Sequence, residues 1–109
     1  MKFTNGADVN GTSLKGYVTT DYDELVACFG QPDFGPDDHG GDKVTCEWSL
    51  EFEDGTVATI YEWKHGYTPR NRCQWNIGGK SIEATVRVMQ ALEMHRDRLY
   101  KMVKEYDHA

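Results

Sequence analysis

The chain has 109 residues, of which 39 % are hydrophobic and 12 % aromatic, and this is enough for one domain with a single modest core. Its net charge of −6 argues against nucleic-acid binding, and no apolar run approaches the roughly 20 residues that a membrane-spanning helix requires. The first residues lack the apolar segment of a signal peptide, so the sequence predicts a cytoplasmic protein.

Two short elements and a loop are predicted before the middle of the chain. Residues 1–12 are rich in glycine and asparagine and predict an irregular start. Residues 13–19 (SLKGYVT) predict a short strand, in which Gly16 indicates an edge position or a bulge. A helix is predicted over residues 22–29, with Thr20 as its N-cap and a glycine and a proline after its end. Residues 31–42 (QPDFGPDDHGGD) then predict a loop.

The most regular pattern lies in residues 43–64 (KVTCEWSLEFEDGTVATIYEWK), where apolar and polar residues alternate as in a strand with one buried face. The Asp54-Gly55 dipeptide predicts a two-residue type I′ turn, and hence a hairpin. This turn fixes the register, and all paired apolar residues then fall on one face. The predicted pairs are Phe52 with Val57, Leu50 with Thr59, Trp48 with Tyr61, and Cys46 with Trp63.

A third strand is predicted over residues 72–77, followed by a long helix that begins near Ser81. The predicted buried stripe of that helix consists of Ile82, Val86, Met89, Leu92, Leu99, Val103 and Tyr106. The order β-α-β-β-β-α predicts an α+β fold of one domain, residues 1–109. We expect a three- to four-stranded antiparallel sheet with one short and one long C-terminal helix packed on one face.

The strongest surface signal is acidic. Residues 21–54 hold eleven acidic side chains and one lysine, whereas residues 55–109 hold nine basic and six acidic side chains. Such a block favours contact with a basic protein surface, either by imitating a phosphate backbone or by docking on a basic patch, although a solvated face would look the same. The candidate protein-binding residues are Asp33, Asp37, Asp38, Asp42, Glu47, Glu51 and Glu62.

Within this set, the predicted register places Glu47 directly opposite Glu62 on the exposed face of the hairpin. Two facing carboxylates are destabilising unless a cation lies between them. That cation is Lys43 or Lys64 if the pair is only structural, and a partner's basic side chain or a metal if the pair is functional. A hydrolase that uses the two carboxylates is a further alternative.

A second candidate site is the turn before the long helix. Free N–H groups at a helix start favour an anion, and two arginines come from the preceding loop. The set for a nucleotide or other small ligand is Arg70, Arg72, Trp75, Gly78, Gly79, Lys80 and Ser81. The segment lacks the spacing of a P-loop, and a Gly-Gly turn between strand and helix also has a purely structural use.

Metal and thiol chemistry find little support in the pattern. The four histidines are scattered, and the three cysteines have no C-x-x-C spacing. Cys28 and Cys46 fall on apolar stripes, which is typical of small buried hydrophobic residues. We therefore expect reduced thiols, no disulfide framework, no metal and no cofactor.

Two resemblances enter at the short helix and the hairpin. The helix that ends in FGQP before a hairpin resembles the helix-then-hairpin unit of beta-lactamase-inhibitor-like domains, which are small binding modules. The runs YDELVACFGQP, EWSLEFEDGTVATIYEWK and WNIGG resemble a family of small uncharacterised proteins of tailed bacteriophages, from about Gly16 to Val88. The second resemblance implies a phage origin and a place in the host cytoplasm, and it implies no catalytic residues.

The sequence contains no convergent set of nucleophile, base and metal ligands, so we interpret the protein as a binding protein and not an enzyme. Its expected role is to inhibit a host protein with a basic surface by direct contact, as a phage counter-defence factor does. That host protein would act in defence or handle nucleic acid. The alternative is sequestration of a small ligand at the Gly78-Gly79 turn. Neither nucleic acid nor a membrane is an expected partner, and a homodimer is compatible with the sequence.

Overall fold

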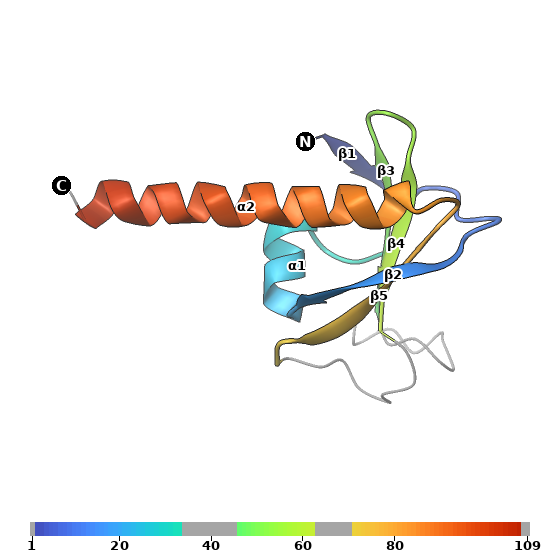
Figure 1. The fold of residues 1–109 in the computed structure, drawn as a ribbon, viewed down its shortest axis with the longest axis horizontal. Helices are drawn as coiled ribbons and strands as arrows, with labels where there is room; N and C mark the ends of the chain where they lie inside the picture. The colour runs from blue at the N-terminus through green and yellow to red at the C-terminus, as the bar shows by residue number, and fades with distance from the viewer. Residues whose placement is uncertain (1, 34–45, 63–70, 108–109) are drawn as a thin grey trace.

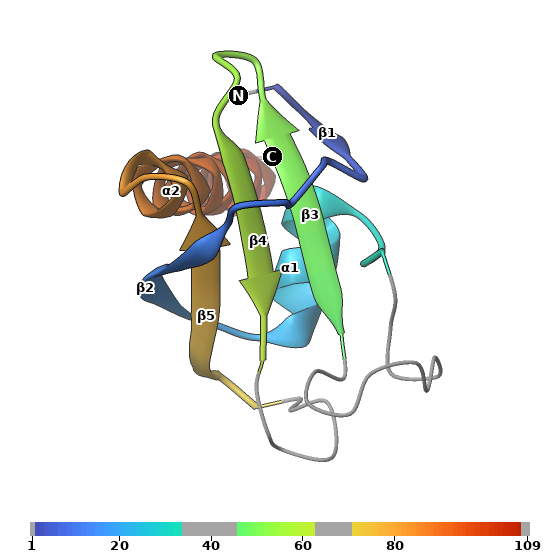
Figure 2. The same cartoon turned by 90° about the vertical axis from the view of Figure 1, so that its right-hand side faces the viewer.

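The computed structural model describes residues 2–33, 46–62 and 71–107, with side chains described up to Glu105. The elements in chain order are β1 (Phe3–Asn5), β2 (Ser13–Thr20), α1 (Tyr22–Phe29), β3 (Glu47–Phe52), β4 (Val57–Tyr61), β5 (Cys73–Gly79) and α2 (Glu83–Asp107). The strands form one antiparallel sheet in the order β1-β3-β4-β5-β2. Both helices lie on the same face of this sheet (Figures 1 and 2), so the predicted α+β architecture is confirmed.

The strand β1 was not predicted, because residues 1–12 read as irregular. It pairs with β3, and Phe3 stands opposite Phe52. The Phe3 ring lies 5.2 Å from the Phe29 ring and 6.1 Å from the Phe52 ring, measured between centroids, with both pairs edge-on. A three-residue strand is too short to show alternation in the sequence, so only these tertiary contacts define it.

The predicted hairpin exists, but its register differs by one residue. The loop has three residues, since the N–H of Phe52 donates to the carbonyl of Thr56 at 2.8 Å and the N–H of Gly55 donates to Phe52 at 2.9 Å. Gly55 has a φ of 88°, the left-handed conformation that closes a three-residue loop containing a type I turn. The Asp-Gly dipeptide therefore occupies the last two positions of a longer loop and does not form a type I′ turn.

This shift moves the alternate residues of β4 to the other face of the sheet. Trp48 stands opposite Ile60, and Leu50 stands opposite Ala58. The predicted pairs of Trp48 with Tyr61 and Leu50 with Thr59 are therefore wrong, as is that of Phe52 with Val57, while Trp63 lies outside the described residues.

The core lies between the sheet and the two helices. Trp48 is its centre, because its ring lies 5.9 Å from the rings of both Tyr22 and Trp75 and its Nε1–H donates to the carbonyl of Gly30 at 2.8 Å. The other fully buried apolar side chains include Leu25, Leu50, Ile60, Ile77, Val88 and Leu92. Cys46 is buried and Cys28 is half-buried against Ala91, and all three cysteines carry free thiols.

The start of α1 differs in detail from the prediction. Asp21 is the N-cap, and its carboxylate accepts from the N–H of Glu24 at 2.7 Å. Thr20 instead ends β2, where it is buried and its hydroxyl donates to the Glu24 carboxylate at 2.5 Å. The predicted end at Gly30 is confirmed, since its φ is 85° and its N–H donates to the carbonyl of Val26.

The predicted buried stripe of α2 is wrong for most of its members. The helix begins at Glu83, and the residues that it buries are Ala84, Val88, Ala91 and Leu92. Five residues of the predicted stripe are exposed instead, namely Ile82, Val86, Met89, Leu99 and Val103. The side chain of Tyr106 lies outside the described residues. Only Leu92 belongs to both sets.

Close packing explains this rotation of the helix. A Cβ on Gly79 would lie 2.3 Å from the Cβ of Ala84, and one on Gly16 would lie 2.6 Å from the Thr85 hydroxyl. Small residues on both sides let α2 approach β5 and β2 closely, and large side chains would not fit there. The hydrophobic pattern alone favoured the wrong face because it weighs large residues more than alanines.

The C-terminal part of α2 extends past α1 and past the edge of the sheet (Figure 1). Every described side chain from Arg96 to Glu105 is exposed. Within the described ranges, no helix combines the length and the apolar character needed to cross a membrane.

Candidate functional site

The face of the sheet opposite the helices, called here the outer face, holds a small cavity. Figure 2 shows the connection from β1 to β2 crossing in front of β3 and β4 on this face. Beneath that connection, the cavity is lined by Val9, Thr12, Ser13, Glu47, Thr59, Tyr61 and Gly78. The lining therefore combines a carboxylate, hydroxyl groups, an aromatic ring and a strip of bare backbone.

Glu47 is the charged group of this cavity. Its side chain is half-buried, and this burial raises the pKa of the carboxyl above its usual range, with the nearby Asp33 carboxylate raising the pKa further. The backbone holds the two residues together, because the N–H of Asp33 donates to the carbonyl of Glu47 at 2.8 Å. The half-buried Glu47 carboxylate thus lies near the exposed Asp33 carboxylate at the start of β3.

Four described basic side chains, Arg72, Arg87, Arg96 and Lys101, form ion pairs with other acids. Arg87 binds Asp54 at 2.8 Å, and Arg96 binds Glu24 at 2.6 Å. Among the described residues, no ion pair joins a basic side chain to Glu47 or Asp33. The excess negative charge at this point is therefore not neutralised by the described part of the fold.

Tyr61 and Gly78 complete the cavity. Burial raises the pKa of the Tyr61 phenol, and the charges of Glu47 and Tyr17 raise the pKa further. A Cβ on Gly78 would lie 2.4 Å from the Thr59 hydroxyl, so glycine is required for Thr59 to occupy its present position. A carboxylate, a hydroxyl acceptor and an aromatic ring are the groups that bind an ammonium or guanidinium ion.

Three predicted protein-binding residues lie on or beside β3, and two of these are close together. Glu51 is exposed further along β3 from Glu47 and Asp33. Asp37, Asp38 and Asp42 fall outside the described residues.

The predicted pair of Glu47 and Glu62 is wrong. Glu47 stands opposite Tyr61, and Glu62 points to the helix side of the sheet with 1 % of its surface exposed. Its charge acts there on Cys73, whose pKa is raised first by burial and then by the Glu62 carboxylate. The one-residue shift of the hairpin separates the two carboxylates, so the structure does not support a hydrolase built on them.

The predicted ligand set does not converge. Gly78 and Gly79 belong to β5 and not to a turn, and they pair with β2 and β4, so their backbone groups serve the sheet. Trp75 is fully buried in the core. The remaining members lie apart. Arg72 precedes β5, and its guanidinium is 3.6 Å from the carboxylates of both Asp21 and Glu24. Lys80 and Ser81 are exposed after the end of β5, and Arg70 is outside the described residues.

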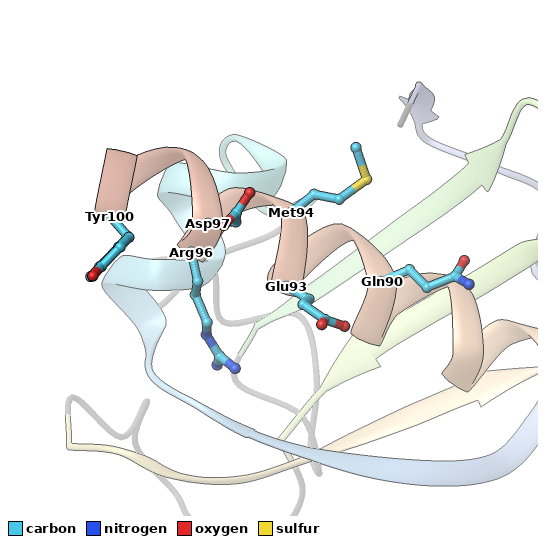
Figure 3. Close-up of a pocket in the computed structure, with 6 residues that line it drawn as sticks. All are labelled: Gln90, Glu93, Met94, Arg96, Asp97 and Tyr100. Carbon is cyan, nitrogen blue, oxygen red and sulfur yellow. The ribbon is translucent and has the colours of Figure 1, made fainter. Parts of the chain in front are cut away.

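A larger but shallow groove lies along α2. Its described lining comes from this one helix and consists of Gln90, Glu93, Met94, Arg96, Asp97 and Tyr100. In Figure 3 these side chains point to different sides of the helix and do not converge on a point. In residues 2–33, 46–62 and 71–107, no three histidine, cysteine or acidic side chains come together as a metal site would require.

Sequence reasoning missed Thr59, Tyr61 and the segment around Val9 as parts of a site. The wrong register assigned Thr59 and Tyr61 to the core face, and residues 1–12 carry no pattern that places them over the sheet. A three-residue loop was the one alternative that would have placed both residues correctly.

No protein-family model matches the chain. No curated protein and no solved structure is significantly similar to it. The candidate site therefore rests on the geometry of the chain itself.

Proposed function

We propose that the protein is a small acidic binding protein, and that the cavity beside Glu47 receives a lysine or arginine side chain of a partner protein. The observation that carries the proposal is the half-buried Glu47 carboxylate next to Asp33, with its raised pKa. A basic group brought into this cavity would relieve the repulsion between the two carboxylates. It would also find the ring of Tyr61 and the hydroxyl of Thr59 within the same lining.

The surrounding charge supports this choice of partner. Residues 21–54 carry eleven acidic side chains against one lysine, and Glu51 adds an exposed carboxylate along β3. Such a distribution attracts a basic surface over a distance of about 8 Å at physiological salt. Binding is therefore expected to weaken as salt is added, mainly through a slower association rate.

The identity of the partner is a further part of the proposal. The likeness of the hairpin sequence to phage proteins supports a bacterial host protein, and an acidic surface supports one that normally binds nucleic acid. By covering that basic surface, the protein would act as an inhibitor. This mechanism requires contact only and no chemical step.

The proposal is tested with basic peptides. Backbone amide spectra of the protein are recorded while a tetra-arginine or tetra-lysine peptide is added, with a tetra-glutamate peptide as the comparison. We expect the basic peptides to shift the amides around Glu47 and Thr59, and Glu47→Gln with Asp33→Asn to abolish these shifts. The matched control is Glu93→Gln, which removes one charge from the exposed surface of α2 and should leave the shifts unchanged.

A bacterial lysate extends the same test to a natural partner. We expect immobilised wild type to retain a partner protein, and added salt should release it. The Glu93→Gln variant should retain the same protein, whereas the Glu47→Gln and Asp33→Asn double variant should not. Peptide shifts that spread evenly over all acidic residues, or a captured protein that all three forms retain equally, would contradict a site at Glu47.

A further inference from the structure

The core-facing stripe of α2 continues beyond the fold. Val88, Leu92 and His95 follow one another at spacings of four and three residues under the sheet and α1, and Leu99 and Met102 continue the same alternation. We call Leu99, Met102 and Val103 the seam, and residues 99–107 of α2 the overhang. The seam side chains are 46 %, 59 % and 60 % exposed.

The described side chains of the overhang form no hydrogen bond, ion pair or ring contact with the rest of the described chain outside α2. Its ion pair and ring contact stay within the helix, with Lys101 3.2 Å from Asp97 and Lys104 over the ring of Tyr100. The overhang is about 13 Å long at 1.5 Å per residue, and in proteins most of the stability of a helix comes from packing of its apolar side. A row of apolar residues that extends a buried stripe predicts a further helix beside it.

We propose that the seam is covered by the overhang of a second copy of this chain, which runs antiparallel to the first. The shape of the molecule limits the choice of direction. On the seam side, α2 is buried as far as Leu92 and half-buried at His95, and Figure 1 shows the sheet and α1 beside this part of the helix. A parallel partner helix would have to pass through that region, whereas an antiparallel partner leaves it free and carries its own sheet beyond the C-terminus of the first helix.

The charges that flank the seam also match a second copy. If Leu99 packs against Met102 of the second copy, two-fold symmetry repeats the contact with the roles exchanged. The same register places Arg98 beside Glu105 of the second copy, because these residues flank the seam at equivalent positions of the 3-4 repeat. A single sequence thus supplies both charges of two symmetric ion pairs.

The expected dimer is weak. The overhang offers three seam side chains and about 13 Å of helix, which is less than the roughly 800 Å² per partner of a standard interface. We therefore expect dissociation in the micromolar range, so that monomer and dimer are both observable.

The test begins with sedimentation velocity on the full chain, from about 1 µM to about 1 mM. The wild type should change from monomer to dimer over this range. Leu99→Glu combined with Met102→Glu should remain monomeric throughout, while its melting temperature when dilute stays that of the wild type. The matched control is Glu93→Gln, which changes an exposed residue of α2 outside the seam, and it should dimerise as the wild type does.

Charge reversal then tests the antiparallel register. Arg98→Glu and Glu105→Arg should each weaken the dimer by about tenfold, because both symmetric pairs become repulsive. Mixing the two variants should restore wild-type affinity, since every pair in the mixed dimer is again opposite in charge. The double variant on one chain should also dimerise as the wild type does.

Three outcomes would overturn the proposal. They are a wild type that is monomeric up to about 1 mM, a dimer that survives both seam substitutions, and a mixture of charge variants that is no tighter than either alone. The first of these would assign the seam to a different protein. None of them bears on the site at Glu47, which lies on the opposite face of the sheet.

Discussion

At the scale of single residues, Trp48 of β3 joins α1 and β5 in the core. Its ring contacts Tyr22 from α1 and Trp75 from β5, and its Nε1–H binds the carbonyl of Gly30 just after α1. We expect Trp48→Ala to lower the free energy of unfolding by about 3–5 kcal/mol, because it leaves a cavity and an unpaired carbonyl. Urea denaturation measures this loss.

The control for this substitution is Tyr17→Ala, which removes an aromatic ring that is about half exposed on the outer face. Its cost should stay near or below 1 kcal/mol, as for most substitutions away from the core. Equal losses for the two variants would contradict the central place of Trp48.

A second prediction at this scale concerns Glu24. Its hydrogen bond with Arg96 lowers the pKa of the carboxyl from 4.5 to about 2, against a smaller opposing effect of burial, and the hydroxyl of Thr20 lowers the pKa further. Because the folded pKa is below the unfolded one, the unfolded state binds more protons as the pH falls. The resulting stability is complete above pH 4.5 and is lost as the pH falls towards about 2.

This effect is measured as the urea midpoint at several pH values for wild type and Glu24→Gln. The difference between the two should stay constant from about pH 6 to about pH 4.5 and then shrink as the pH falls to about 2. Glu93→Gln, on the exposed surface of α2, should follow the wild-type curve. A wild-type-like curve for Glu24→Gln would show that the Arg96 contact adds no stability.

At the scale of elements, the contact between β5 and α2 depends on two small residues. A Cβ on Gly79 would lie 2.3 Å from the Cβ of Ala84 and 3.2 Å from the carbonyl of Val57. We expect Gly79→Ala to cost about 1–3 kcal/mol, because the helix must move away from the strand. Ala84→Gly alone should cost about 1 kcal/mol as a glycine near the start of a helix.

The double variant gives the decisive measurement. If the two methyl groups compete for one space, Gly79→Ala with Ala84→Gly should cost clearly less than the two single losses together. Losses that simply add would mean that the strain at Gly79 lies against the backbone of Val57 instead.

The elements show which parts of the fold the sequence could predict. The period of apolar residues identified α1, α2, the hairpin and β5, because each of these has one buried face over many residues. The Asp54-Gly55 dipeptide fits both a two-residue and a three-residue hairpin loop. The loop length decides on which face of the sheet each β4 side chain lies. The position of Glu62 in the core and of Tyr61 on the outer face followed from that choice.

The buried face of α2 was predicted wrongly for a different reason. Which side of an amphipathic helix is buried depends on how closely the helix approaches the sheet, and this is set by glycines on other strands. Gly16 and Gly79 make the alanine side of α2 the better fit, a property of the assembled layers that no single segment contains.

At the scale of the whole molecule, the two proposed surfaces lie on different sides of one sheet. The site around Glu47 is on the outer face, and the seam is on α2, which packs on the opposite face. A dimer formed through the overhangs would leave both outer faces accessible. Two copies would then present two acidic sites to a partner, which strengthens binding wherever the partner offers two basic sites at a matching distance.

The last prediction separates the folded body from the overhang. The described side chains beyond Arg98 contact only their own helix, so a chain that ends after Arg98 should keep its melting temperature within about 2 °C when dilute. A chain that ends after Ala91 should melt far lower, because it loses the buried Leu92 and the ion pair between Arg96 and Glu24. Circular dichroism measures both. If the chain that ends after Arg98 also melted far below the wild type, the overhang would belong to the fold of the single chain. The seam would then need no second copy to cover it.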